Sequence, residues 1–184
     1  MAHIDLGNDL PGIRGPMAYR PETAKPLNEL AEILLRDDNN TLTRGERELI
    51  GSYVSGLNDC FFCHNVHGAL AQHYMQCDTQ YIDDIKKDYS LTPISPKLKA
   101  LLSIAGSVQK GGKYVTAEQI EQAKDLGATD NEIHDTVLIA AAFCMFNRYV
   151  DGLASFTPTD PAVYEEMGER MAKGYVMPPS PEGE

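Results

Sequence analysis

The chain has 184 residues, a formal net charge of -11 at pH 7 and four cysteines. A chain of this length can bury a hydrophobic core as one domain, without disulfide bonds or a metal ion to stabilise it. The acidic charge argues against nucleic acid or an anionic membrane as a partner, because both bind basic surfaces. The cysteines are too few and too unevenly spaced for a secreted disulfide framework. We therefore expect a cytoplasmic protein without a nucleic-acid or membrane partner.

The two ends of the chain differ in composition from its middle. Residues 1–25 carry closely spaced Gly and Pro, which predicts an extended arm packed on the surface or on a neighbouring subunit. The arm lacks the charged and apolar segments of a signal peptide. The longest apolar run, Val137 to Phe146, has ten residues, about half of a membrane span. We expect residues 26–175 to form a single domain and residues 176–184, rich in Pro and Glu, to be disordered.

Helical periodicity and capping signals divide the middle of the chain into helices. An amphipathic helix is expected from Pro26, and the capping box at Thr43 to Glu46 opens a second helix that ends near Leu57. The third helix is expected from about Cys60 to Tyr74. The others are expected over residues 79–88, from 96, over 117–126, from 129 and over 161–173. The sequence therefore predicts an all-α domain of about seven or eight helices, built largely from antiparallel helix pairs.

The densest cluster of reactive side chains is the segment CFFCHNVH, residues 60–67, which holds two thiols and two imidazoles. On a helix, Cys60, Cys63 and His67 fall within an arc of about 60°. Residues three apart on a helix have Cβ atoms about 5–6 Å apart, so a modest adjustment allows a disulfide. The start of a helix also favours thiolate over thiol. The segment therefore predicts a redox-active dithiol.

A thiol that cleaves peroxides needs a proton acceptor and a second thiol that resolves its sulfenic acid. His67, one turn after Cys63, can accept the proton of that thiol, and Cys60 can then close the disulfide. The helix dipole alone favours Cys60 as the more acidic thiol, whereas the position of His67 favours Cys63; we assign Cys63 as the attacking thiol. An acid on the preceding helix would orient His67, and Glu48 ranks only marginally above Glu46 for that role.

Glu48, Cys60, Cys63 and His67 form the pattern E-x11-C-x2-C-x3-H. This pattern resembles the active-site signature of the alkylhydroperoxidase D (AhpD) family, which is part of the carboxymuconolactone decarboxylase-like superfamily. The resemblance extends over about residues 27–153, and the layout is most similar to the peroxidase-related subgroup. It implies an all-α homo-oligomer in which Cys63 attacks the peroxide, Cys60 resolves, and Glu48 with His67 relays protons.

The resemblance also implies the partners. The substrate would be a hydroperoxide and the reductant a dithiol, either a thioredoxin-like or a lipoyl protein, with no cofactor. The family often has a histidine between the two cysteines, whereas this chain has Phe61 and Phe62 there and His64 after Cys63. We treat Phe61, Phe62 and His64 as candidates for the wall of an apolar pocket that accepts organic hydroperoxides. An equally open interpretation is that one or both phenylalanines belong to the core.

Two other cofactor-binding interpretations exist for the same segment. The pattern C-x-x-C-H also matches the attachment motif of c-type haem, which normally requires export. A zinc site has suitable ligand types, but structural zinc usually takes a CxxC from a knuckle rather than from a helix, so we expect no metal. The zinc ligands would be Cys60, Cys63 and His67 with Cys77, His64 or His73.

Two other functions remain open. A lactone decarboxylase is the enzymatic alternative within the superfamily, although such enzymes typically lack the redox pair. An oligomeric redox sensor would keep the thiols but would not turn over peroxide.

Overall fold

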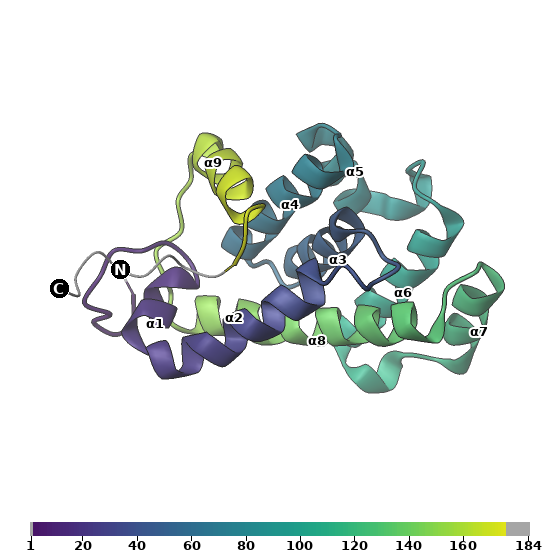
Figure 1. Cartoon of the computed structure of the whole chain (residues 1–184), viewed down its shortest axis with the longest axis horizontal. Helices are drawn as coiled ribbons and strands as arrows, with labels where there is room; N and C mark the ends of the chain where they lie inside the picture. Colours follow the sequence, from purple (N-terminus) through teal and green to yellow (C-terminus); the bar gives the residue numbers. More distant parts are fainter. Residues whose placement is uncertain (1, 176–184) are drawn as a thin grey trace.

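The structure is a computed structural model and describes residues 2–175. Over these residues its regular secondary structure is helical, with no strand, which confirms the expected all-α class (Figure 1). The α-helices are α1 (Arg14–Tyr19), α2 (Pro21–Arg36), α3 (Arg44–Leu57), α4 (Phe61–Met75), α5 (Thr79–Asp88), α6 (Pro96–Lys110), α7 (Ala117–Asp125), α8 (Asp130–Gly152) and α9 (Pro161–Met171), with short 3-10 helices at Tyr89–Leu91 and Gly112–Tyr114. The tail that we expect to be disordered, 176–184, lies outside the described residues.

The first 25 residues differ from the extended arm that their composition predicts. Helix α1 lies entirely within them, and α2 begins at Pro21 rather than at Pro26. Proline is tolerated in the first turn of a helix, because the N–H that it lacks has no intrahelical partner there. Pro21 is the first residue of α2, and Pro16 lies in the first turn of α1. The density of Gly and Pro therefore does not prevent helix formation in this segment.

Three helices begin at capping boxes, as their sequence predicts. The threonine side chain at each N-cap accepts the backbone N–H three residues on, and the Glu or Gln there accepts the N–H of the threonine. Each such cap stabilises its helix by about 1 kcal/mol. The capping threonines are Thr43 of α3, Thr116 of α7 and Thr129 of α8.

Helix α3 lies at the centre of the molecule and contacts α2, α4, α5, α6 and α8 (Figure 1). Its apolar side chains belong to the main core, together with apolar side chains of α6 and α8. Helix α9 covers α4, and between them lies a smaller apolar cluster that contains Cys60 and Cys63. In the part of the chain that the structure describes, none of the helices has the length and apolar character needed to cross a membrane. The fold thus surrounds the CxxC segment with helix α3 on one side and α9 on the other.

Gly51 of α3 is needed for the close approach of α3 and α8. A Cβ atom at this position would lie 2.3 Å from Cζ of Phe143, and the same ring packs edge-to-face on His67 with 4.5 Å between centroids. Overpacking a core costs about 1–3 kcal/mol. We expect Gly51→Ala to lower the free energy of unfolding by about that amount, measured by urea denaturation.

Gly152, the last residue of α8, supplies the matched control. An added Cβ there has no atom within 4 Å, so Gly152→Ala should change the free energy of unfolding by less than about 0.5 kcal/mol. Equal stabilities of the two variants would contradict the packing that we describe between Gly51 and Phe143.

Candidate active site

A tight turn between α3 and α4 brings the predicted site residues together. Asp59 adopts the left-handed region with φ 56°, and the chain folds back so that α4 runs along α3. Cys60 is the N-cap residue of α4 and Cys63 lies in its first turn. Because α4 and α3 make the most extensive helix contact in the described chain, His67 on α4 lies beside Glu48 on α3.

Glu48 and His67 form a buried hydrogen-bonded pair. His67 Nδ1 lies 2.7 Å from Glu48 Oε2, and the two side chains are 13% and 0% exposed. Because Nδ1 contacts the carboxylate, Nε2 is the ring nitrogen left for proton exchange. Glu46, the other acid considered for this role, is exposed and accepts hydrogen bonds from Thr43 in the capping box of α3. The acid that contacts His67 is therefore Glu48.

Tyr175, which follows α9, completes the surroundings of this pair. Its hydroxyl donates to Glu48 Oε1 and lies 3.5 Å from His67 Nδ1. Its ring stacks on the imidazole with 6.1 Å between centroids and 18° between planes. Burial, followed by the charge of Glu48, raises the pKa of Tyr175 well above its usual value, so the hydroxyl remains a donor. The sequence contains no local signal for this contact, because 127 residues separate Tyr175 from Glu48.

The two thiols are buried at the start of α4. Cys60 is 0% and Cys63 is 4% exposed, and both are free cysteines. A hydrogen bond to Cys63 and burial both raise the pKa of Cys60, and the nearby carboxylate of Asp151 adds to that effect. Burial in turn raises the pKa of Asp151. Cys60 is therefore held in its protonated form next to Cys63, which matches a resolving thiol better than an attacking one.

The raised pKa of Cys60 predicts selective alkylation of the native protein. Since each unit of increase lowers the thiolate fraction tenfold below the pKa, and iodoacetamide reacts with thiolate, Cys60 should be the slower of the two thiols at pH 7.5. We expect Cys63 to be modified at least about tenfold faster than Cys60 under limiting reagent, as measured by mass spectrometry of the separated peptides. Faster labelling of Cys60 would contradict the assignment of Cys63.

The three pocket candidates occupy different environments. Phe61 is 52% exposed and lines a surface groove between α4, α5 and α9. Phe62 is buried and lies so close to Gly12 that a Cβ there would be 2.1 Å from its ring. His64 faces α3, where its Nδ1 lies 3.1 Å from the carbonyl oxygen of Ser52, and burial lowers its pKa. Of the three, only Phe61 lines this groove.

Tyr164 of α9 is a second residue that sequence reasoning missed. Its ring lies 6.0 Å from that of Phe61 and 6.1 Å from that of Phe62, and it shares the groove with Phe61. Burial, with the charges of Cys60 and Cys63, raises the pKa of Tyr164 to about 12. Its hydroxyl donates to the carbonyl oxygen of Pro158 at 2.6 Å. Tyr164 therefore belongs to the apolar cluster that contains both thiols and also lines the groove, and its hydroxyl stays neutral.

Within residues 2–175, no group of three or more His, Cys, Asp or Glu side chains is arranged to hold a metal ion. In particular, the zinc ligands considered above do not form such a group. One nitrogen of His67 is already used by Glu48, and Cys77 lies beyond the far end of α4.

Comparison with known proteins identifies the scaffold. A family model described as the Carboxymuconolactone decarboxylase family matches residues 72–157. The structure is similar to the AhpD core of an uncharacterized peroxidase-related protein from Ralstonia eutropha JMP134, with a TM-score of 0.76 and 27% identity over 86% of this chain and 81% of that chain. The match over residues 72–157 and the shared fold together support the AhpD/carboxymuconolactone decarboxylase-like superfamily for this chain.

Two further structures share the fold of this AhpD-like chain. An uncharacterized peroxidase-related protein from Silicibacter sp. TM1040 has a TM-score of 0.75 and 22% identity, over 84% of this chain and 78% of that one. A protein of unknown function from Agrobacterium tumefaciens has a TM-score of 0.67 and 21% identity, over 79% of this chain and 97% of that one. No match was found among curated proteins. The family model begins at residue 72, so the segment 60–67 lies outside it.

Proposed function

We propose that this AhpD-like chain is a thiol-dependent peroxidase that uses the Cys60–Cys63 pair. The observation that supports the proposal most directly is the 2.7 Å contact between Glu48 and His67, one helical turn from Cys63 on α4. A buried carboxylate that orients an imidazole next to a thiol is the arrangement that activates a nucleophile. The 27% identical structure from Ralstonia eutropha JMP134, described as a peroxidase-related protein, adds support.

In the first step, His67 Nε2 accepts the proton of Cys63 and Glu48 stabilises the resulting imidazolium. The Cys63 thiolate attacks the distal oxygen of the hydroperoxide, so an S–O bond forms as the O–O bond breaks. The leaving alkoxide takes the proton from His67 and departs as an alcohol. Sulfur is oxidised to sulfenic acid and the peroxide is reduced, so atoms and electrons balance.

In the second step, Cys60 attacks the sulfenic sulfur of Cys63. The disulfide forms, and the hydroxyl group leaves as water with the proton of the Cys60 thiol. A dithiol reductant, thioredoxin-like or lipoyl, then reduces the disulfide and is itself oxidised to a disulfide. The cytoplasm, where we expect the protein, keeps such dithiols reduced.

The surroundings of the thiols favour organic hydroperoxides over hydrogen peroxide. Cys60 and Cys63 pack among apolar and aromatic side chains, including Phe62, Val66 and Met167. The nearby groove adds Phe61 to this apolar surface. Apolar side chains of this kind bind the alkyl group of an organic hydroperoxide better than they bind the polar hydrogen peroxide molecule.

We also propose that the chain forms a homo-oligomer, as the resemblance implies. The long helix α8 leaves Leu138 and Met145 exposed on one face, where a second copy would cover them. Analytical ultracentrifugation measures the state directly.

The test of the function is the thiol balance of a single reaction. We expect that reduced protein, mixed anaerobically with one equivalent of cumene hydroperoxide, loses two thiols and gains a Cys60–Cys63 disulfide identified by peptide mapping. Dihydrolipoamide or dithiothreitol should then sustain repeated turnover. A Cys77→Ser variant is the control, since Cys77 lies beyond the end of α4 and should not alter the balance. A disulfide that forms once without sustained turnover would contradict the peroxidase function and favour the redox sensor.

A further inference from the structure

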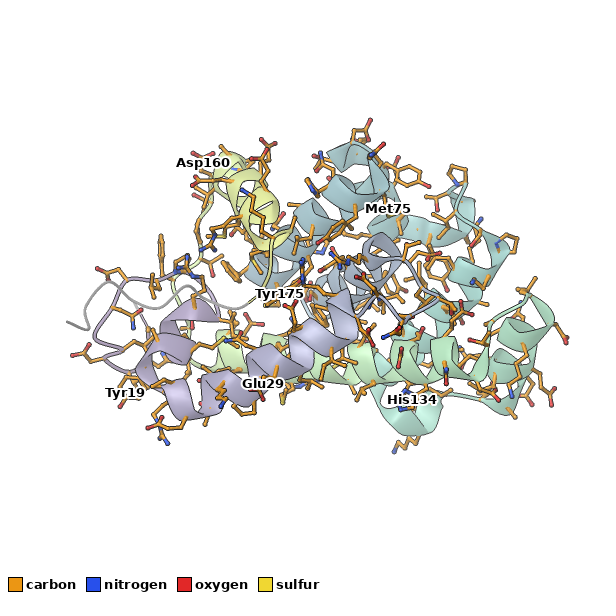
Figure 2. The ribbon with its side chains drawn as sticks, in the orientation of Figure 1. Tyr19, Glu29, Met75, His134, Asp160 and Tyr175 are labelled. Atoms are coloured by element: carbon orange, nitrogen blue, oxygen red, sulfur yellow. The ribbon has the colours of Figure 1, made fainter. Side chains whose placement is uncertain are left out.

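The segment after α9 is tied to the site by side chains from two other helices. Arg36 of α2 donates from Nη1 to the carbonyl oxygen of Ala172 at 2.7 Å, and the hydroxyl of Tyr74 donates to the same oxygen at 3.1 Å. The backbone N–H of Tyr175 donates to Glu32 Oε2 at 3.2 Å. Figure 2 shows Tyr175 in the middle of the molecule and Asp160, which precedes α9, near its upper edge. The chain thus returns to the Glu48–His67 pair and is held there.

Tyr175 donates to the oxygen of the Glu48 carboxylate that His67 does not contact. Glu48 is fully buried, with His67 at Oε2 and the Tyr175 hydroxyl at Oε1. Hydrogen bonds to a carboxylate are strongest where water is excluded. A carboxylate bound on both oxygens is also fixed in orientation. Without Tyr175, a buried Glu48 would keep His67 as its single partner among the described side chains.

We propose that Tyr175 is a positioning residue for the proton relay: its hydroxyl fixes the orientation of the Glu48 carboxylate, so that Glu48 retains the proton on His67 Nδ1 and leaves Nε2 to act on Cys63. The role rests on the proposed thiol chemistry of Cys63. The ring of Tyr175, stacked on the imidazole of His67 with 6.1 Å between centroids, also covers one side of the Glu48–His67 pair.

The helices packed around this site contribute both apolar and charged side chains to it. Helix α8 contributes the apolar ring of Phe143. Besides Glu48 of α3 and His67 of α4, the charged and titratable groups at the site are Glu32 and Arg36 from α2, Arg47 from α3 and Tyr74 from α4. Substituting the Tyr175 hydroxyl alone leaves all of them in place, so a changed pH profile reports on that hydroxyl.

The test is the pH dependence of Cys63 alkylation by iodoacetamide, followed by mass spectrometry of the Cys63 peptide. Tyr175→Phe keeps the stacked ring and removes only the donor. Because a weaker Glu48–His67 pair stabilises the thiolate less, we expect the midpoint to rise by about 0.5–1 pH unit. Tyr74→Phe is the matched control: it removes a hydroxyl that holds the same segment but does not contact Glu48, and its midpoint should stay within about 0.2 unit of the original.

A double-mutant cycle separates positioning from simple tethering. If Tyr175 acts through Glu48, Tyr175→Phe should produce no further shift in a Glu48→Gln background. An unchanged midpoint in Tyr175→Phe, or the same shift in both backgrounds, would overturn the role of Tyr175 but not the Glu48–His67 relay. An unchanged midpoint in Glu48→Gln would overturn both the relay and this role of Tyr175.

Discussion

Replacing Cys63 with serine should reduce peroxide consumption to the rate of buffer alone, the largest effect that we expect. A serine hydroxyl is a far weaker nucleophile than a thiolate, and Cys60 cannot substitute for Cys63 because burial still raises the pKa of Cys60 in this variant. The measurement is the loss of cumene hydroperoxide with excess dithiol, with circular dichroism to verify the fold.

Cys77→Ser is the matched control, since Cys77 has no place in the proposed chemistry. It should consume peroxide at the original rate. Peroxide consumption by Cys63→Ser at more than a small fraction of that rate would mean that another group attacks the substrate.

Glu48→Gln should lower the second-order rate constant with hydroperoxide by about 10²-fold or more, because general acid–base catalysis typically contributes 10²–10⁴-fold. Gln keeps the size of the buried side chain but removes the charge that stabilises the His67 imidazolium. The deficit should narrow as the pH rises, because more of the thiol then ionises without help from a base. Stopped-flow measurements between pH 6 and 9 give both the size and the pH dependence of the deficit.

Glu46→Gln is the control for that change. It alters an acid two residues away on the same helix, and Gln at this position also satisfies a capping box, so α3 should remain capped. We expect its rate constant to match that of the unaltered protein. Equal losses in the two variants, or a Glu48→Gln deficit that is the same at every pH, would contradict the relay.

The parts of the molecule that could be predicted are those with local causes. Capping boxes depend on side chains three residues apart, and the helices that begin after Thr43, Thr116 and Thr129 are found where the sequence places them. The Glu48–His67 contact could also be predicted, because a short turn at Asp59 makes α4 fold back along α3. Spacing along two adjacent helices was enough for that pair.

The parts that could not be predicted depend on contacts between distant segments. Tyr175 and Tyr164 reach the site from the end of the chain, and the residues next to them carry no motif. Helix α1 was missed because the density of Gly and Pro describes a whole segment, whereas the effect of a proline depends on its position. Pro16 is tolerated because it lies within the first turn of that helix. The direction of His64, toward Ser52, follows from which face of α4 packs on α3.

In the proposed mechanism, Cys63 attacks the peroxide and Cys60 resolves the sulfenic acid. The most direct measurement is the mass of the Cys63 peptide from a Cys60→Ser variant treated with one equivalent of cumene hydroperoxide and then with dimedone, which forms a stable adduct with sulfenic acid. The proposed mechanism predicts a dimedone adduct on Cys63, with no second turnover. A Cys63 peptide that remains unmodified while the peroxide is consumed would contradict it.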